Sequence, residues 1–150
     1  MTPITVSLVV IDAPAPGTFE AMYRALDACS RPLIGPAPPH LLVIPIRDDA
    51  GLVTGGLWGL TQFQWLHVEM LIVPGPLRRQ GVGSALMAAA ENEARGRGCL
   101  GAHLDRFSFQ ATSFYEKLGY ELFGVLKDLP PGYSRLYFQK RFGSLPVRRP

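Results

Sequence analysis

The stretch Arg78-Arg79-Gln80-Gly81-Val82-Gly83-Ser84 lies between a segment that predicts a strand and a segment that predicts a helix. The strand is expected to stop at Pro74-Gly75-Pro76, and the helix to begin near Ser84. Gly81 and Gly83 lack a Cβ, so backbone N–H groups can close around a bulky anion. The first N–H groups of a helix attract anions, and two arginines add forked donors for phosphate oxygens. The stretch therefore predicts a pyrophosphate-binding turn.

Two common phosphate-binding loops are excluded by what this stretch lacks. A P-loop needs a lysine and then a serine or threonine after its second glycine, and no lysine follows Gly83. A dinucleotide fingerprint needs a third glycine where Leu86 stands, and an acid about 20 residues farther on. Asp105 lies near that distance, but the missing glycine and the two arginines argue against this type. What remains is Arg-x-x-Gly-x-Gly, with its fixed positions at Arg78, Gly81 and Gly83.

This pattern resembles the acyl-coenzyme A loop of the GNAT N-acetyltransferase superfamily. The downstream segment Ser108-Phe109-Gln110-Ala111-Thr112-Ser113-Phe114-Tyr115-Glu116-Lys117-Leu118-Gly119-Tyr120 looks like the family's second signature, an alanine, then Phe-Tyr, then Lys-x-Gly-aromatic. One predicted helix and one predicted strand separate the two signatures, as in that family. Many members have asparagine where this chain has the shorter Ser108. The resemblance covers roughly Trp65 to Phe142.

The resemblance implies an α/β protein with the GNAT fold. This fold has a mixed, mostly antiparallel central sheet flanked by helices, and two parallel strands splay apart to form the cofactor cleft. The pattern of apolar residues and turn residues agrees with this layout. The predicted elements are a strand over 4–11, a helix over about 19–28, a proline-rich loop over 31–39, strands over 41–46, 52–60 and 62–73, a helix from about 84 to Gly96-Arg97-Gly98, a strand over 99–107, a short helix over 111–118, and strands over 120–125 and 134–142.

The composition indicates one ordinary globular domain, because 150 residues with 47% hydrophobic side chains can form a core of their own. We expect a single domain over residues 1–142 and a basic Pro/Arg tail over 143–150. From Arg135 onward the chain carries five basic residues and no acid. A nucleic-acid-binding stripe would normally run across the whole domain. We therefore expect a solvated tail and no nucleic-acid partner.

The sequence predicts neither a membrane protein nor an exported one. Its apolar stretches are interrupted before they reach the roughly 18 residues of a membrane span, and the N-terminus lacks the features of a secretory signal. Cys29 and Cys99 fall at a predicted helix end and a predicted strand start, which argues against a disulfide framework or a metal site. We expect a cytoplasmic protein without a metal. Because proteins of the fold that this chain resembles often dimerise, we also expect a homodimer.

The resemblance implies acetyl-CoA as co-substrate, held by the glycine turn and by the exposed backbone of the preceding strand. The pantetheine arm is rich in amides, so it can pair with a strand backbone much as another strand would. The side chains of that strand segment alone would indicate ordinary core. The predicted cofactor-binding residues are Leu71, Ile72, Val73, Arg78, Arg79, Gln80, Gly81, Val82, Gly83, Ser84, Ser108, Ala111, Phe114 and Tyr115.

Acetyl transfer to an amine needs an acceptor for the amine's proton and a donor for the departing thiolate. By resemblance Tyr115 is the candidate acid, although its helical spacing also fits a core tyrosine. Period-two alternation places Trp65, His67, Glu69, Leu71 and Val73 on one face of their strand. Glu69 is the candidate base, acting directly or through a water. His67 and solvent are the alternatives.

These residues predict an N-acetyltransferase that moves an acetyl group from acetyl-CoA to a primary amine of a small molecule or peptide by direct attack. The alternative is a non-catalytic acyl-CoA-binding sensor or interaction module on the same fold. Consumption of the cofactor distinguishes the two. The acceptor amine is not specified by any motif in the chain.

Overall fold

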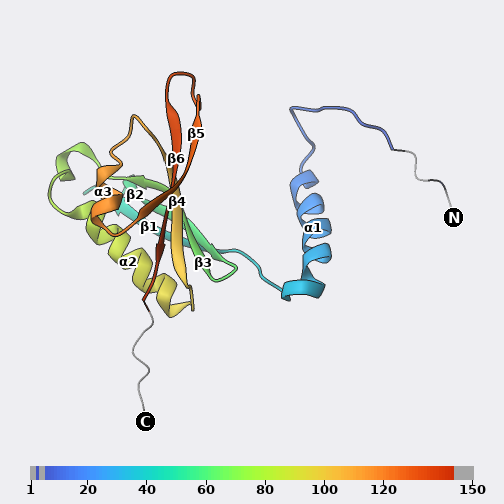
Figure 1. Ribbon diagram of the computed structural model, residues 1–150, viewed down its shortest axis with the longest axis horizontal. Coiled ribbons are helices and arrows are strands. Elements are labelled where there is room, and N and C mark those ends of the chain that lie inside the picture. Colours follow the sequence, from blue (N-terminus) through green and yellow to red (C-terminus); the bar gives the residue numbers. More distant parts are fainter. Residues whose placement is uncertain (1–2, 4–5, 144–150) are drawn as a thin grey trace, which may run out of the picture. The chain divides into compact units, whose positions relative to one another are not determined.

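The computed structural model describes Pro3 and residues 6–143. The chain divides into two units, Met1–Ala37 and Pro38–Pro150, and each is described by itself. Figure 1 shows one helix in the first unit and a sheet with two α-helices in the second. The predicted single domain over 1–142 stays a prediction. The predicted tail over 143–150 lies outside the described residues, apart from its first residue.

Helix α1 (Thr18–Ile34) is the regular element among the described residues of the first unit. It confirms the predicted helix over 19–28 but is longer. It continues into the predicted loop over 31–39 and ends before Gly35, whose φ is 72°. Pro32 lies inside the last turn, where it removes only one N–H donor close to the helix end. The prediction therefore ended this helix too early, because it assigned the proline-rich residues 31–39 to a loop.

The predicted strand over 4–11 is wrong for residues 6–11, which form no strand. Residues 4 and 5 lie outside the described part of the chain. A β-branched run forms a strand only when it can pair with another strand. The described residues of the first unit contain no second strand that could pair with it.

The second unit is built on a six-stranded sheet with the order β1-β2-β3-β4-β6-β5. The β3–β4 pair is parallel, and every other neighbouring pair is antiparallel. This arrangement confirms the predicted mixed, mostly antiparallel sheet with flanking helices. The strands are β1 (His40–Arg47), β2 (Val53–Gln62), β3 (Trp65–Ile72), β4 (Gly101–Phe107), β5 (Glu121–Lys127) and β6 (Ser134–Arg141).

Strands β3 and β4 separate partway along their length, as predicted. Their parallel pairing runs from Trp65 opposite Gly101 to Val68 opposite Leu104 and goes no farther. Strand β3 continues to Ile72 and β4 continues to Phe107 without pairing to each other. An opening between the two strands results, and backbone groups on its two edges are not used by the β3–β4 ladder.

A β-bulge at Glu69 changes which residues of β3 face the core. Trp58 pairs with Met70 and the next residue of β2 pairs with Val68, so Glu69 is the extra residue. Beyond the bulge, Leu71 packs against the same core as Val68. Val73 packs against this core as well. The prediction that Leu71 and Val73 share a face with His67 is therefore wrong, because strict alternation holds only in an unbulged strand.

Helix α2 (Val82–Gly96) packs across one face of the sheet, against β1 to β4 (Figure 1). Ala90 and Ala94 are fully buried, and their small side chains allow the helix backbone to approach the strands closely. The short helix α3 (Ser113–Lys117) adds Tyr115 to the same core cluster. Within the described residues, no helix combines the length and apolar character needed to cross a bilayer.

The buried carboxylate of Glu91 fastens α2 to the sheet. Only 5% of Glu91 is exposed. The hydroxyl of Tyr120 donates a hydrogen bond to Oε1 at 2.9 Å, and Nζ of Lys140 donates to Oε2 at 2.9 Å. Burial and the neighbouring Glu91 raise the pKa of Tyr120, so this hydroxyl keeps its proton and remains a donor.

We expect Glu91→Ala to lower the free energy of unfolding by about 3 kcal/mol, because it leaves a buried hydroxyl and a partly buried ammonium without their acceptor. Glu93→Ala is the matched control on the same helix. Its side chain is 57% exposed and pairs with Arg97, so the expected loss is below about 1 kcal/mol. Urea unfolding of both variants measures the difference. Equal losses would contradict the role assigned to Glu91.

Candidate functional site

The loop between β3 and α2 is held in place by its own side chains. After a short 3-10 turn (Gly75–Leu77), Nε of Arg78 donates to the carbonyl oxygen of Val73 at 3.1 Å. Nε2 of Gln80 donates to the carbonyl oxygen of Pro76 at 2.9 Å. The first bond ties the loop back to the residue that follows β3, and the second ties it to the 3-10 turn. The side chain of Gln80 therefore stabilises the loop.

The N-terminus of α2 offers backbone donors that the helix itself does not use. The N–H of Ala85 donates to the carbonyl oxygen of Gly81 at 3.0 Å, which is the first i to i−4 bond. The N–H groups of Val82, Gly83 and Ser84 precede this bond and have no intrahelical acceptor. They form a positive helix end of the kind that binds phosphate groups.

The two glycines of the loop are needed for different reasons. Gly81 has φ of 77°, in the left-handed region that glycine adopts without strain, and a Cβ there would meet no atom within 4 Å. A Cβ on Gly83 would lie 3.2 Å from the Phe114 ring and 3.5 Å from Cγ2 of Val73. The first glycine thus permits the turn, and the second permits the close packing of the helix end.

A cleft of about 960 Å³ opens in front of this helix end. It brings together most of the predicted cofactor residues, whereas Gln80, Ser108 and Glu69 are not part of its lining. The predicted residues that line it are Leu71, Ile72, Val73, Arg78, Arg79, Gly81, Val82, Gly83, Ser84, Ala111, Phe114 and Tyr115.

Ser108 has a local structural partner instead. Its Oγ accepts a hydrogen bond from the N–H of Ser134 at 3.0 Å, and its own N–H donates to the carbonyl oxygen of Ser134 at 2.8 Å. These two bonds join the end of β4 to the start of β6. The serine that replaces the family's asparagine therefore holds the sheet together at this point.

Sequence reasoning missed four lining residues, Leu77, Arg106, Phe109 and Gln110. Phe109 and Gln110 lie inside the second signature segment, so the motif could have included them. The signal for Arg106 was a charge at an inward position of a predicted strand. Only 8% of Arg106 is exposed.

Tyr115 lines the cleft and is buried, with 4% of its surface exposed. Its ring packs edge-on against Phe114, with ring centroids 4.9 Å apart. Nε of Arg106 donates to Oη of Tyr115 at 2.9 Å. Burial raises the pKa of Tyr115 above its ordinary value, and the guanidinium of Arg106 partly offsets this effect. The phenol keeps its proton at neutral pH and can donate it.

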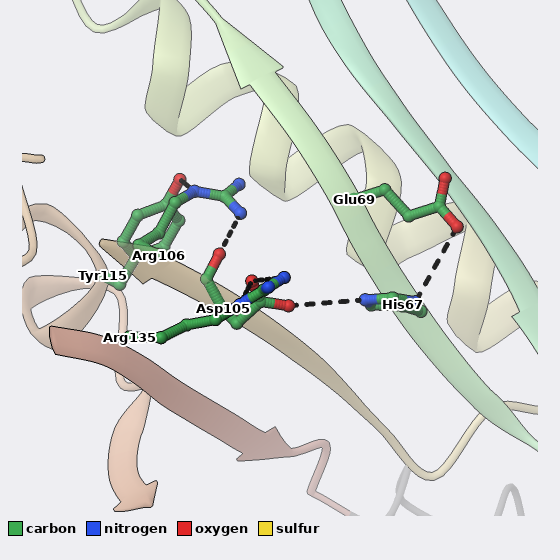
Figure 2. A network of polar contacts seen from close by, with 6 residues as sticks. All are labelled: His67, Glu69, Asp105, Arg106, Tyr115 and Arg135. Atoms are coloured by element: carbon green, nitrogen blue, oxygen red, sulfur yellow. Dashed lines mark hydrogen bonds and ion pairs between the residues drawn. The ribbon is translucent and has the colours of Figure 1, made fainter. Parts of the chain in front are cut away.

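A series of polar contacts leads from Glu69 toward Tyr115 through His67, Asp105 and Arg106, and Arg106 is joined to Asp105 by the main-chain carbonyl oxygen, as Figure 2 shows. Nδ1 of His67 lies 3.9 Å from Oε1 of Glu69, and Nε2 of His67 lies 4.0 Å from Oδ1 of Asp105. The guanidinium of Arg135 pairs with Oδ2 of Asp105 at 2.5 Å. The candidate acid and the candidate base thus lie at opposite ends of one network.

The His67 ring also stacks on the His103 ring, with centroids 4.5 Å apart and planes 7° apart. Burial and the adjacent His67 lower the pKa of His103, while Asp105 acts in the opposite direction. The side chain of Glu69 is more accessible than that of His67, since 41% of it is exposed. No group of three or more His, Cys, Asp or Glu side chains that could hold a metal ion occurs among the described residues.

Comparison with known proteins agrees with this geometry. The model of the acetyltransferase (GNAT) family matches residues 9–120. Acetyltransferase Atu2258 of Agrobacterium fabrum is 41% identical over 123 residues, which are 82% of this chain and 90% of the relative. Blasticidin-S acetyltransferase of Streptomyces morookaense is 40% identical over 112 residues, 73% of this chain and 82% of the relative.

A crystal structure of an Agrobacterium tumefaciens protein superimposes with a TM-score of 0.84 and 38% identity, covering 91% of this chain and all of the other. The sequence prediction of an acyl-CoA-dependent N-acetyltransferase is confirmed at the level of the family and of its named relatives. The chain belongs to the GNAT family of acetyltransferases.

Proposed function

We propose that this enzyme acetylates the primary amine of a small molecule, with Tyr115 as the acid and Glu69 as the base. One observation carries the proposal, namely that the helix end with unused N–H groups and the buried Tyr115 hydroxyl line the same cleft. The relative named blasticidin-S acetyltransferase, at 40% identity, supports an acceptor of that kind. A peptide amine is the alternative acceptor.

The cleft residues suit the parts of acetyl-CoA in order. The N–H groups of Val82, Gly83 and Ser84 would hold the diphosphate, with Arg78 and Arg79 adding charge. The backbone of 71–73, beyond the end of the β3–β4 ladder, would pair with the pantetheine amides. Bound in this way, acetyl-CoA supplies an activated acetyl group as a thioester.

The transfer balances with two proton movements. The amine nitrogen attacks the thioester carbonyl carbon, the new C–N bond forms, and the C–S bond breaks. The hydroxyl of Tyr115 gives its proton to the departing sulfur, and the excess proton of the acceptor nitrogen goes to Glu69, directly or through a water. Solvent returns the phenol and carboxylate to their starting states, so the products are an amide and coenzyme A.

Glu69 is the proposed base because the bulge presents it at the point where β3 leaves β4, and its side chain reaches solvent. His67, 3.9 Å away, is the alternative base. Glu69→Gln should lower kcat/KM by about 10²-fold near neutral pH, because it removes the proton acceptor and keeps the shape of the side chain.

His67→Gln separates the two bases. If Glu69 is the base, this variant keeps the wild-type kcat/KM. If His67 is the base, His67→Gln loses about 10²-fold in kcat/KM and Glu69→Gln keeps it. Wild-type kcat/KM in both variants would mean that solvent accepts the proton and would refute both assignments.

The experiment for the function as a whole is thiol release from acetyl-CoA with a panel of small amines and peptides. We expect release that depends on the amine and saturates with it. An acyl-CoA sensor would bind the cofactor, as titration calorimetry would show, without consuming it. That outcome would refute the enzymatic function and leave the binding site standing.

We also propose one domain over residues 1–142, a cytoplasmic location, a homodimer, and no nucleic-acid or membrane partner. The composition and the habits of the family support these proposals. Analytical ultracentrifugation tests the dimer. Binding to duplex DNA at several salt concentrations, with and without residues 143–150, tests the basic tail.

A further inference from the structure

Arg106 is a buried cation that lines the cleft and has one nitrogen without a hydrogen-bond partner. It extends from β4, is 8% exposed and lines the cleft. Nε donates to Oη of Tyr115 at 2.9 Å, and Nη1 donates to the carbonyl oxygen of Asp105 at 2.5 Å. Nη2 is buried and has no hydrogen-bond partner. Among the described residues it is the one buried side-chain nitrogen or oxygen in this state.

An unpaired donor on a buried guanidinium is destabilising, because the charged group has lost its water without gaining an acceptor. Native structures keep few such groups, and those they keep usually have a functional explanation. Two protein acceptors already hold Arg106 in its buried position. They do not explain why Nη2 lacks an acceptor. Arg106 lines the cleft, and Nη2 is closed to solvent in this conformation, so a small rotation of the guanidinium would bring Nη2 to an acceptor bound there.

The geometry of a guanidinium indicates where that acceptor belongs. Nε–H and one N–H of a terminal nitrogen point the same way, as a fork that two neighbouring oxygens can accept. The Nε–H of this pair already donates to Oη of Tyr115. A ligand oxygen next to the phenol would receive the second bond. The acyl-pantetheine arm carries carbonyl oxygens in its amides and in its thioester, and the proposed path of this arm ends at Tyr115.

We propose that Arg106 binds a carbonyl oxygen of the acyl-CoA arm through Nη2 and positions Tyr115 through Nε. This inference rests on the proposed function for its substrate. The Nε–H bond uses a lone pair of Oη, so the hydroxyl hydrogen is directed toward another acceptor, the departing sulfur. Once that proton has moved, the same Nε bond joins a cation to a phenolate and becomes stronger.

Arg106 is well placed for this role because few other polar groups reach Tyr115. In the described structure, the charged or titratable groups that contact it are Arg106 itself and Tyr120 of the segment after α3. The Tyr120 hydroxyl is already bonded to Glu91. The Phe138 ring of β6 and the Phe114 ring close the remaining sides.

The test compares Arg106→Met, Arg106→Lys and the control Arg47→Met with the wild-type enzyme. Methionine keeps the apolar stem and removes every donor, while lysine keeps the charge with a single donor atom. Arg47 lies at the end of β1, where its side chain bonds the turn carbonyl of Gly51 and is outside the cleft. Titration calorimetry measures affinity for acetyl-CoA and for free coenzyme A. ¹³C NMR of tyrosine Cζ, assigned with Tyr115→Phe, reports hydrogen bonding at Oη.

We expect Arg106→Met to lose about 10- to 100-fold in acetyl-CoA affinity and to shift the Tyr115 Cζ resonance. Arg106→Lys should recover part of the affinity, and Arg47→Met should change neither quantity. A loss confined to acetyl-CoA assigns Nη2 to the thioester carbonyl. An equal loss for coenzyme A assigns it to a pantetheine amide.

Wild-type affinity together with an unmoved Tyr115 resonance in Arg106→Met would overturn the proposal. If the methionine variant does not fold, the same two measurements on Arg106→Lys decide it, because one nitrogen cannot serve both partners. Neither measurement needs turnover. A wild-type protein that binds acetyl-CoA without consuming it would therefore refute the proposed function and still leave Arg106 testable.

Discussion

Tyr115→Phe is expected to lower kcat by about 10²- to 10⁴-fold, the range that a positioned acid contributes, with little change in acetyl-CoA affinity. The ring contacts with Phe114 and Phe138 survive in this variant, and only the proton donor is removed. Burial holds the pKa of Tyr115 above its ordinary value, so the wild-type phenol stays protonated across the neutral range. Thiol release and titration calorimetry measure the two quantities separately.

Tyr120→Phe is the matched control for that experiment. It removes an equally buried hydroxyl 6.1 Å away between ring centroids, but that hydroxyl bonds Glu91 and lies outside the cleft lining. This variant should lose stability by about 1–3 kcal/mol and keep its kcat. If Tyr115→Phe keeps wild-type kcat, or if both variants lose kcat equally, Tyr115 is a core tyrosine and not the acid.

Gly83→Asp is expected to weaken acetyl-CoA binding by at least about 10²-fold while the protein stays folded. Its Cβ would press on the Phe114 ring at 3.2 Å, and its carboxylate would bind the N–H groups that we assign to the diphosphate. Repulsion between like charges a few ångströms apart, near a protein surface, is on the order of several kcal/mol. The same carboxylate favours the N-terminus of a helix, so the variant should still fold.

Two further glycine variants distinguish the effect of the added Cβ from the effect of the added charge. Gly83→Ala adds the Cβ without the charge and should weaken binding less. Gly96→Asp adds a carboxylate at the other end of α2, where a Cβ meets no atom within 4 Å, and should leave affinity unchanged. Undiminished affinity in a folded Gly83→Asp variant would refute the diphosphate site.

The sequence was sufficient for the parts of the site that depend on local chemistry. The turn around Gly81 and the start of α2 follow from glycine conformation and helix-end donors, both of which are readable from neighbouring residues. The position of Tyr115 in the cleft followed from a family signature, since its helical spacing alone also fits ordinary core.

The remaining features depend on contacts between distant segments. The bulge at Glu69 arises from how β3 pairs with β2, so alternation along β3 could not reveal it. The hydrogen bond from Nε of Arg106 to Tyr115 joins β4 to α3. The apolar run over residues 6–11 failed as a strand because strand formation requires a partner that its own sequence does not specify.

The most direct test of the account is a crystal structure of the enzyme with coenzyme A bound. We predict the diphosphate on the N–H groups of Val82, Gly83 and Ser84, and the sulfur within hydrogen-bonding distance of the Tyr115 hydroxyl. Coenzyme A bound elsewhere, or bound in the cleft with its sulfur directed away from Tyr115, would contradict it.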